Sequence, residues 1–189
     1  LQVFSHIITC LVEGEFMQME DVYRIDQGIE RYMTKTQKKT ADFMEGCMEL
    51  GGLLGGWSES EIVELKKYGH ALGMAFQITD DIMDYRETTE TTGKPVGNDL
   101  REGLLTYPLL SIVNDDNKDK LLEDIKALNN GGDEQAIIDY VIGQGGIDNT
   151  LAVADQYCKD ALAALDAVRD FPGKEFLVMA VENLADRKV

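Results

Sequence analysis

The chain has 189 residues, 44% of them hydrophobic, a composition typical of a folded domain with an apolar core and not of a disordered segment. Its 35 acidic and 18 basic side chains give a net charge of −17, which disfavours binding to nucleic acid or to anionic lipid. The three cysteines and two histidines lack zinc-ligand spacing, so we expect free thiols in a reducing compartment, the cytoplasm, and no zinc site.

Helix is the secondary structure that the pattern predicts almost everywhere. Only three prolines interrupt the chain, and few stretches alternate with period two. No apolar run approaches the roughly 18 residues that a membrane span needs, and no signal peptide is visible. We therefore expect one all-α domain over residues 1–189, without a membrane span.

The first two predicted helices cover residues 3–20 and 26–54. The first has an apolar stripe made of Phe4, Ile7, Ile8 and Leu11, and its segment 14–18 (GEFMQ) is interpreted as packing. The second carries a group of basic residues in an otherwise base-poor chain, which is either a solvated face or a functional cluster. The group consists of Arg31, Lys35, Lys38 and Lys39, followed by Thr40.

The third predicted helix runs from Ser58 to about residue 85. Ser58 with Glu61 three residues later predicts a capping box at its start. Near its end, Asp80, Asp81 and Asp84 form a DDxxD set between apolar residues. Carboxylates at helical spacing repel one another and are costly to bury, whereas clustered hard oxygen ligands suit Mg²⁺. The competing interpretation is a solvated acidic face.

A polar loop over residues 86–97 follows, with Lys94 as a basic residue inside it. Thr106 and Pro108 predict the capped first turn of a helix that continues to Val113. The remaining chain reads as core-forming helices at about 118–128, 134–142, 147–169 and 174–186, without candidate chemistry. Trp57, at the turn before the third helix, is predicted to be a packing anchor.

The segment FQITDDIMD, residues 76–84, resembles the second aspartate-rich motif of the trans-isoprenyl diphosphate synthases, the polyprenyl synthetase family. The resemblance extends over essentially the whole chain and is closest to the medium- and long-chain bacterial enzymes. The further matching positions are Gly14-Glu15, Tyr32, Lys39-Thr40, Gly93-Lys94, Gly97 to Leu100, Glu102-Gly103 and Thr106 to Pro108.

This resemblance implies an isoprenoid-synthase-type helical bundle around a central cavity. It implies an enzyme that condenses isopentenyl diphosphate with an allylic diphosphate, assisted by Mg²⁺. It also implies a homodimer or heterodimer that uses the first two helices. Asp80 would hold Mg²⁺ directly, and Asp81 and Asp84 directly or through water.

The resemblance also assigns the substrate side of the site. Lys39 and Lys94 would contact the allylic diphosphate. The carbonyl of Lys39 and the side chains of Thr40 and Gln77 would face the allylic cation, and Phe76 belongs to the substrate-binding set. No protein nucleophile is required by this chemistry, and none is evident.

Two departures from the family pattern matter. The family's other aspartate-rich motif, with the basic pair that follows it, is absent from these residues. We therefore expect a C-terminal part of a longer enzyme, inactive alone, whose product length cannot be read. Leu104 also stands where many members have lysine. The alternatives are a non-catalytic or regulatory subunit of a heteromeric synthase, and an all-helical terpene cyclase or squalene-type enzyme.

Overall fold

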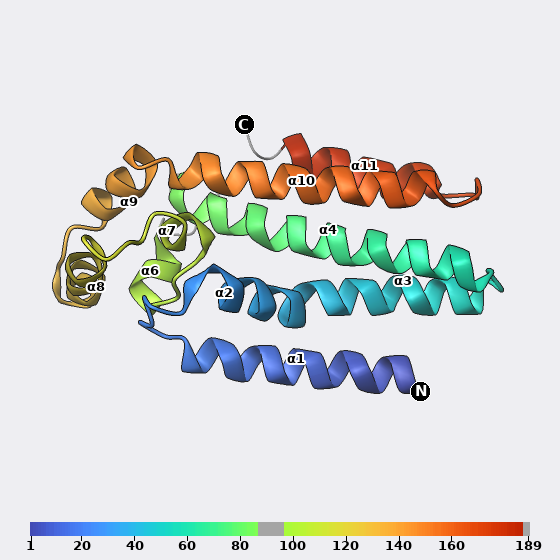
Figure 1. Cartoon of the computed structure of the whole chain (residues 1–189), viewed down its shortest axis with the longest axis horizontal. Helices are drawn as coiled ribbons and strands as arrows, with labels where there is room; N and C mark the ends of the chain where they lie inside the picture. Colours follow the sequence, from blue (N-terminus) through green and yellow to red (C-terminus); the bar gives the residue numbers. More distant parts are fainter. Residues whose placement is uncertain (87–96, 187–189) are drawn as a thin grey trace.

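A computed structural model describes residues 1–86 and 97–186, and these ranges contain helices and turns but no strand. The all-α prediction is confirmed. Long helices lie side by side along the long axis of the molecule, with α4 between α3 and α10 (Figure 1). These long helices are α1 (Gln2–Glu20), α3 (Asp42–Leu54), α4 (Glu59–Arg86), α10 (Gly146–Asp166) and α11 (Lys174–Asp186).

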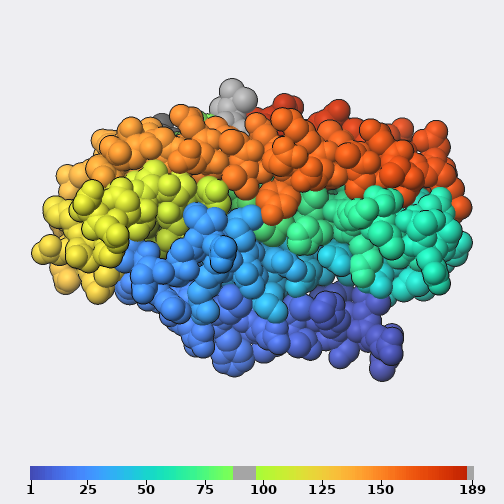
Figure 2. Space-filling view, in the orientation of Figure 1, coloured from blue at the N-terminus to red at the C-terminus, as the bar shows by residue number. Residues whose placement is uncertain are grey.

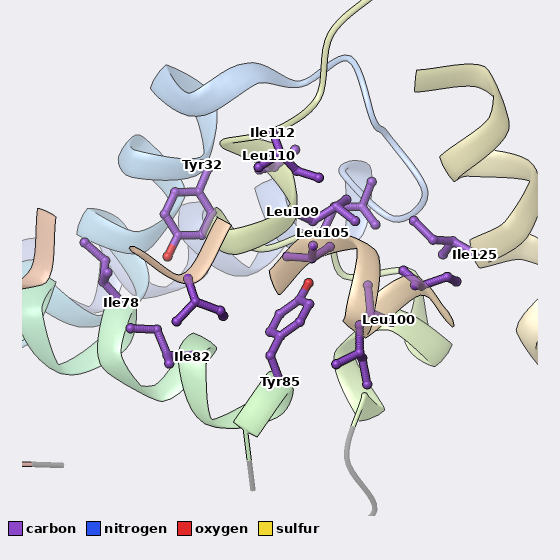
Figure 3. Close-up of a cluster of buried hydrophobic side chains, with 14 of the residues drawn as sticks. Tyr32, Ile78, Ile82, Tyr85, Leu100, Leu105, Leu109, Leu110, Ile112 and Ile125 are labelled. Atoms are coloured by element: carbon purple, nitrogen blue, oxygen red, sulfur yellow. The ribbon is translucent and has the colours of Figure 1, made fainter. Parts of the chain in front are cut away.

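The shorter elements gather mainly at one end of the bundle, around the C-terminal end of α4 (Figure 1). This end contains α2 (Gly28–Thr36), α6 (Asn98–Glu102), α7 (Tyr107–Leu110), α8 (Lys118–Ala127), η2 (Leu128–Asn130) and α9 (Glu134–Gly143). Figure 3 shows apolar side chains from these segments and from α4 meeting in one cluster, which includes Tyr32, Ile78, Ile82, Tyr85, Leu100, Leu109 and Ile125. This cluster fixes the position of the last turns of α4.

Glycines on α4 bring its backbone against the preceding helical segment. A Cβ atom added at Gly73 would lie 2.6 Å from the Cα of Ala41, and one at Gly69 would lie 2.6 Å from the carbonyl oxygen of Met44. Backbone atoms cannot move aside as a flexible side chain can, so larger residues at these positions would separate the helices. The close contact sets the end of α4 opposite residues 37–41.

The second predicted helix is not continuous, and the expectation of one helix over residues 26–54 is wrong in its middle. Residues Gln37–Ala41 form a π-helix, η1, between α2 and α3. The N–H of Asp42 bonds the carbonyl of Gln37, five residues earlier. A π-helical turn accommodates an extra residue, so the side chains on either side change their rotation about the helix axis.

Helix α1 forms one edge of the molecule (Figure 2). The predicted apolar stripe is only partly correct, because Ile7 is buried whereas Phe4 and Ile8 are 61% and 47% exposed. Close glycine contacts determine the rotation of α1 instead. A Cβ at Gly14 would lie 2.9 Å from the backbone nitrogen of Lys39, and one at Gly46 would lie 2.4 Å from Ile7.

The features predicted for the starts of two helices, α4 and α7, are partly confirmed and partly wrong. Ser58 and Glu61 make both bonds of a capping box, at 3.4 Å from the Glu61 N–H to Ser58 Oγ and 3.2 Å from the Ser58 N–H to Glu61 Oε2. Pro108 lies in the first turn of α7 as predicted. Thr106 makes no capping bond, and α7 ends at Leu110 and not at Val113. The hydroxyl of Thr106 is buried and lies beside the hydroxyl of Tyr85.

No helix within the described residues is both long enough and apolar enough to cross a membrane.

Candidate functional site

A cavity of about 210 Å³ lies where α1, α2, η1 and the end of α4 meet the segment after α6. Four of the residues predicted from the sequence line this cavity, although they are separated by up to 42 positions in the chain. They are Lys39, Gln77, Asp80 and Asp81. Its lining consists of Gln18, Tyr32, Lys35, Thr36, Lys39, Gln77, Asp80, Asp81, Asp99, Leu104, Leu105 and Thr106. A larger hollow of about 520 Å³ between α8 and α9 contains no predicted site residue.

Neighbouring aspartates on α4 have different environments. The side chain of Asp80 is exposed and lines the cavity, whereas Asp81 is only 4% exposed. The hydroxyl of Tyr32 donates to Asp81 Oδ2 at 2.6 Å, and Gln77 Nε2 donates to Asp81 Oδ1 at 3.0 Å. Burial raises the pKa of Asp81 to about 6, although these two hydrogen bonds oppose the shift. Asp81 is thus held in place, and Asp80 is free to bind a ligand.

Asp84 interacts with backbone at the start of α6. Its carboxylate accepts the backbone N–H of Asn98 at 3.0 Å and that of Asp99 at 3.1 Å. Burial raises the pKa of Asp84, and these bonds act in the opposite direction. Asp84 is not among the residues that line the cavity. Its contacts instead fix α6, which carries Asp99 into the wall of the cavity.

Asp99 lines the cavity but was not among the site residues predicted from the sequence. Burial is the main cause that raises its pKa to about 7, followed by the charges of Asp84, Asp81 and Asp80. The only available signal was its place in the matched stretch from Gly97 to Leu100, because nothing local indicates that it lies beside the aspartates of α4. Its position adds a fourth carboxylate to the cluster.

Two lysines, Lys35 and Lys39, form a basic part of the cavity wall. Lys39 Nζ lies 2.9 Å from Glu15 Oε2 and donates to Gln18 Oε1 at 2.7 Å. Both partners belong to the segment of α1 that was interpreted as packing, so that interpretation missed a polar contact with the site. Lys35 is 7% exposed, and burial lowers its pKa although Asp21 lies 3.7 Å away.

A polar chain connects η1 to the aspartates. The hydroxyl of Thr40 donates to Gln77 Oε1 at 3.1 Å, and Gln77 in turn donates to Asp81. The π-helical turn that contains Lys39 and Thr40 is a feature often found at functional sites. It places both residues beside α4, as the close contact at Gly73 requires.

Phe76 and Lys94 are the predicted residues that this group does not include. Phe76 is 38% exposed on α4 and is not among the residues that line the cavity. Lys94 lies outside the described residues. The chain has Leu104 in the cavity wall, at the position where many relatives of the resembled family have lysine.

The residues present fit a divalent cation such as Mg²⁺. Asp80, Asp81 and Asp99 supply carboxylate oxygens to one cavity, and burial raises the pKa values of Asp81 and Asp99. A bound cation is the usual compensation for such a group.

Known proteins are similar to this chain in sequence and in fold. The model of the family described as "Polyprenyl synthetase" matches residues 1–143. The chain is 34% identical over 167 residues to "Heptaprenyl diphosphate synthase component 2" of Geobacillus stearothermophilus, covering 88% of this chain and 52% of that protein. It is 32% identical over 181 residues to "Octaprenyl diphosphate synthase" of Escherichia coli, covering 94% and 56%.

Solved structures of other proteins have a similar fold. A decaprenyl diphosphate synthase from Rhodobacter capsulatus superposes with a TM-score of 0.88 at 25% identity, over 100% of this chain and 59% of that one. A polyprenyl synthase from Caulobacter crescentus, complexed with calcium and isoprenyl diphosphate, gives 0.86 at 28%, over 100% and 58%. The chain thus spans about half the length of the curated relatives that it matches. From its sequence match and its shared helical fold, the chain belongs to the polyprenyl synthetase family.

Proposed function

We propose that this chain contributes to an enzyme that condenses isopentenyl diphosphate with an allylic diphosphate to form a polyprenyl diphosphate. The observation that carries the proposal is the cavity that Asp80, Asp81 and Asp99 line together with Lys35 and Lys39. Acidic and basic walls around one space suit a diphosphate bound together with divalent cations. The similarity to proteins named heptaprenyl and octaprenyl diphosphate synthases supports the same reaction.

The aspartates form the cation-binding wall in this proposal. Asp80 and Asp99 would hold Mg²⁺, and Asp81 would keep the wall in shape through Tyr32 and Gln77. When bound, Mg²⁺ would neutralise the diphosphate as it leaves. Asp84 would contribute by anchoring α6, and with it Asp99, or by binding Mg²⁺ through water.

The lysines and the neutral polar side chains of the site would bind the substrate and stabilise the charge that develops. Lys39 and Lys94 would contact the allylic diphosphate, and Thr40 and Gln77 would direct their dipoles at the allylic carbon, with Phe76 among the residues that hold the prenyl chain. As the carbon–oxygen bond breaks, the electron pair goes to the diphosphate. The double bond of isopentenyl diphosphate then attacks the carbon, and a proton is lost to the departed diphosphate. Preorganised charge and exclusion of water would provide the rate enhancement.

A second candidate function is a non-catalytic or regulatory subunit of a heteromeric synthase. It is favoured by one relative, which is named a component of heptaprenyl diphosphate synthase. The residues that line the cavity argue for the catalytic role, because a subunit without activity has no need to retain a buried aspartate such as Asp81.

The deciding experiment measures incorporation of labelled isopentenyl diphosphate into an allylic diphosphate, with magnesium, by the protein expressed from the whole gene. We expect product, and chromatography gives its chain length. The 189-residue chain is expected to be inactive alone, because these residues contain one aspartate-rich motif, whereas the resemblance to the family implies two. If the whole protein is active only when mixed with a second polypeptide, and Asp80→Asn leaves that activity intact, the subunit function is correct.

Association and location belong to the same proposal. Exposed apolar side chains follow one face of α1 at intervals of four residues, namely Phe4, Ile8, Val12 and Phe16. This face supports a homodimer or heterodimer in which the first two helices take part. We propose the cytoplasm as its location, as expected from the free thiols. Sedimentation of the wild type and of Phe16→Glu measures the association, and an unchanged mass would exclude this face.

A further inference from the structure

A second group of metal-binding atoms lies away from the cavity, where α1 meets α3 and α4. We propose that His6, Cys10 and Asp42 bind one Zn²⁺ ion, in contrast to the expectation from sequence spacing. One nitrogen of His6, the sulfur of Cys10 and a carboxylate oxygen of Asp42 all lie within 4.8 Å of one another. His6 and Cys10 are one helical turn apart on α1, and Asp42 begins α3.

The distances fit a tetrahedral ion. Cys10 Sγ lies 3.6 Å from His6 Nε2 and 3.8 Å from His6 Nδ1. With Zn–S near about 2.3 Å and Zn–N near about 2.0 Å, two ligands of a tetrahedral site lie roughly 3.5 Å apart. His6 is exposed, so its ring can rotate to direct a nitrogen at the ion. The ion can also reach the site from solvent past His6.

The donor set discriminates between metals. Nitrogen, thiolate and carboxylate ligands suit Zn²⁺, whereas Mg²⁺ takes oxygen ligands and retains water. Cys10 and Asp42 are 4% and 8% exposed, so two of the three ligands are already desolvated. Binding breaks the Cys10 S–H bond, forms the S–Zn bond and releases the proton to solvent. Water completes the fourth position.

Neighbouring polar groups hold Asp42 in place. Gln37 Nε2 donates to Asp42 Oδ1 at 3.2 Å, and the thiol of Cys10 is hydrogen-bonded to the same carboxylate, an interaction that a bound ion would replace. Such outer contacts orient metal ligands in known sites. On its other side Asp42 also lies within 4.8 Å of ligand atoms of Glu45 and His70, and His70 Nδ1 is 3.6 Å from Glu45 Oε2. Asp42 is therefore surrounded by possible metal-binding side chains from α1, α3 and α4.

Occupancy of this site would fasten α1 to α3. Helix α1 lies at the edge of the molecule with one apolar face exposed, and further along it Glu15 and Gln18 contact Lys39 in the cavity wall. An ion at His6 and Cys10 would fix the other end of the same helix. The proposal does not depend on the prenyl chemistry, because none of its ligands lines the cavity.

Cobalt(II) titration of the purified, reduced full chain tests the site, since Co²⁺ replaces zinc and reports thiolate ligation by its charge-transfer absorption. We expect this absorption to saturate at one ion per chain and to disappear when Zn²⁺ displaces Co²⁺, with excess Mg²⁺ present throughout. Cys10→Ser should abolish the band. His6→Ala and Asp42→Asn should weaken zinc affinity by more than about 100-fold, since even outer-contact changes cost about 10- to 100-fold.

Matched controls separate this site from others. Cys47→Ser removes an exposed thiol, and Asp80→Asn alters the aspartate cluster, so both should retain the band. Because His6 is exposed, His6→Ala keeps the test valid even if a buried ligand variant fails to fold. The proposal is overturned if wild type shows no thiolate band, if Cys47→Ser removes it, or if His6→Ala binds zinc as tightly as wild type.

Discussion

The two halves of α4 are built from different kinds of contact. Along the first half, Leu65, Tyr68 and Ala71 belong to an apolar cluster with small residues of α10 such as Ala161 and Ala164. The buried hydroxyl of Tyr68 donates to the carbonyl of Leu177 at 3.0 Å. The burial of apolar surface with few polar groups stabilises the fold directly.

Along the second half, buried polar groups interrupt the apolar cluster. Thr79 and Asp81 are 1% and 4% exposed, and the carboxylate of Asp81 depends on Tyr32 and Gln77 for its hydrogen bonds. Burying a carboxylate is unfavourable unless it is paired. One helix therefore combines a half that stabilises the fold with a half in which charged side chains are buried at a cost in free energy. We expect a bound ligand to compensate for that cost.

Substitution at the charged half should affect catalysis most strongly. Asp80→Asn keeps the shape of an exposed side chain but removes its charge, so we expect kcat of the whole protein to fall by about 1000-fold or more, as at other sites of preorganised charge. The thermal midpoint without metal should not decrease. Steady-state kinetics and calorimetry measure both, and a loss of stability equal to that of a core variant would erase the contrast.

The apolar half should give the opposite result. Leu165 is 1% exposed in the cluster beside α4, so Leu165→Ala should lower the free energy of unfolding by about 2–5 kcal/mol. The affinity for an allylic diphosphate should stay unchanged while the variant remains folded. Urea denaturation and calorimetric titration provide the two measurements. A large change in affinity would mean that the two halves are coupled.

Adjacent lysines allow a matched test of the basic wall. Lys39 lines the cavity, whereas Lys38 pairs with Glu13 at 2.5 Å outside it. Lys39→Ala should reduce kcat/KM by about 100-fold, or roughly 2.7 kcal/mol. Lys38→Ala should remain within about threefold of wild type, since exposed ion pairs contribute little. Equal effects of the two substitutions would contradict the assignment of Lys39 to the substrate-binding site.

The charged half should also make stability depend on pH. The pKa values of Asp81 and Asp99 are raised to about 6 and about 7, so the folded protein retains protons that the unfolded chain has released. Without divalent metal, the free energy of unfolding should therefore decrease as pH rises from about 4 to about 7, by on the order of 2 kcal/mol. Asp99→Asn should flatten this dependence in urea denaturation at pH 5 and pH 8. A stability that rises with pH in both proteins would contradict the assignment.

The smallest effect is expected at the start of α4. Ser58→Ala removes the hydroxyl of the capping box and should cost about 1 kcal/mol of stability. Catalytic constants should not change, because the cap lies at the far end of the helix from the aspartates. Thermal denaturation combined with a kinetic assay checks this, with Ser60→Ala as a control for loss of a nearby hydroxyl. Equal losses in the two variants would exclude a specific cap.

The role of Trp57 illustrates how far local inference extends. The sequence predicted a packing anchor at the turn before α4, and the ring of Trp57 packs edge-on against Phe171 at 4.8 Å between centroids. The guanidinium of Arg169 lies 4.6 Å from the same ring. The prediction of an anchor is confirmed, but its partners, more than 100 residues later in the chain, could not be predicted.

The sequence alone determined the helical class, the capping box at Ser58 and the motif that ends α4. These features depend on local periodicity, on the absence of chain breakers and on side chains within one turn of each other. It also carried the resemblance that the family match confirmed.

Only the tertiary structure decided which residues meet. It rotated α1 so that Phe4 is exposed, introduced the π-helix at residues 37–41, joined Asp99 to the aspartates and brought His6 and Cys10 to Asp42. The physical reason is that helix rotation is set by contacts between backbones distant in sequence, such as that of Gly73 with Ala41, and these contacts do not follow from any single segment.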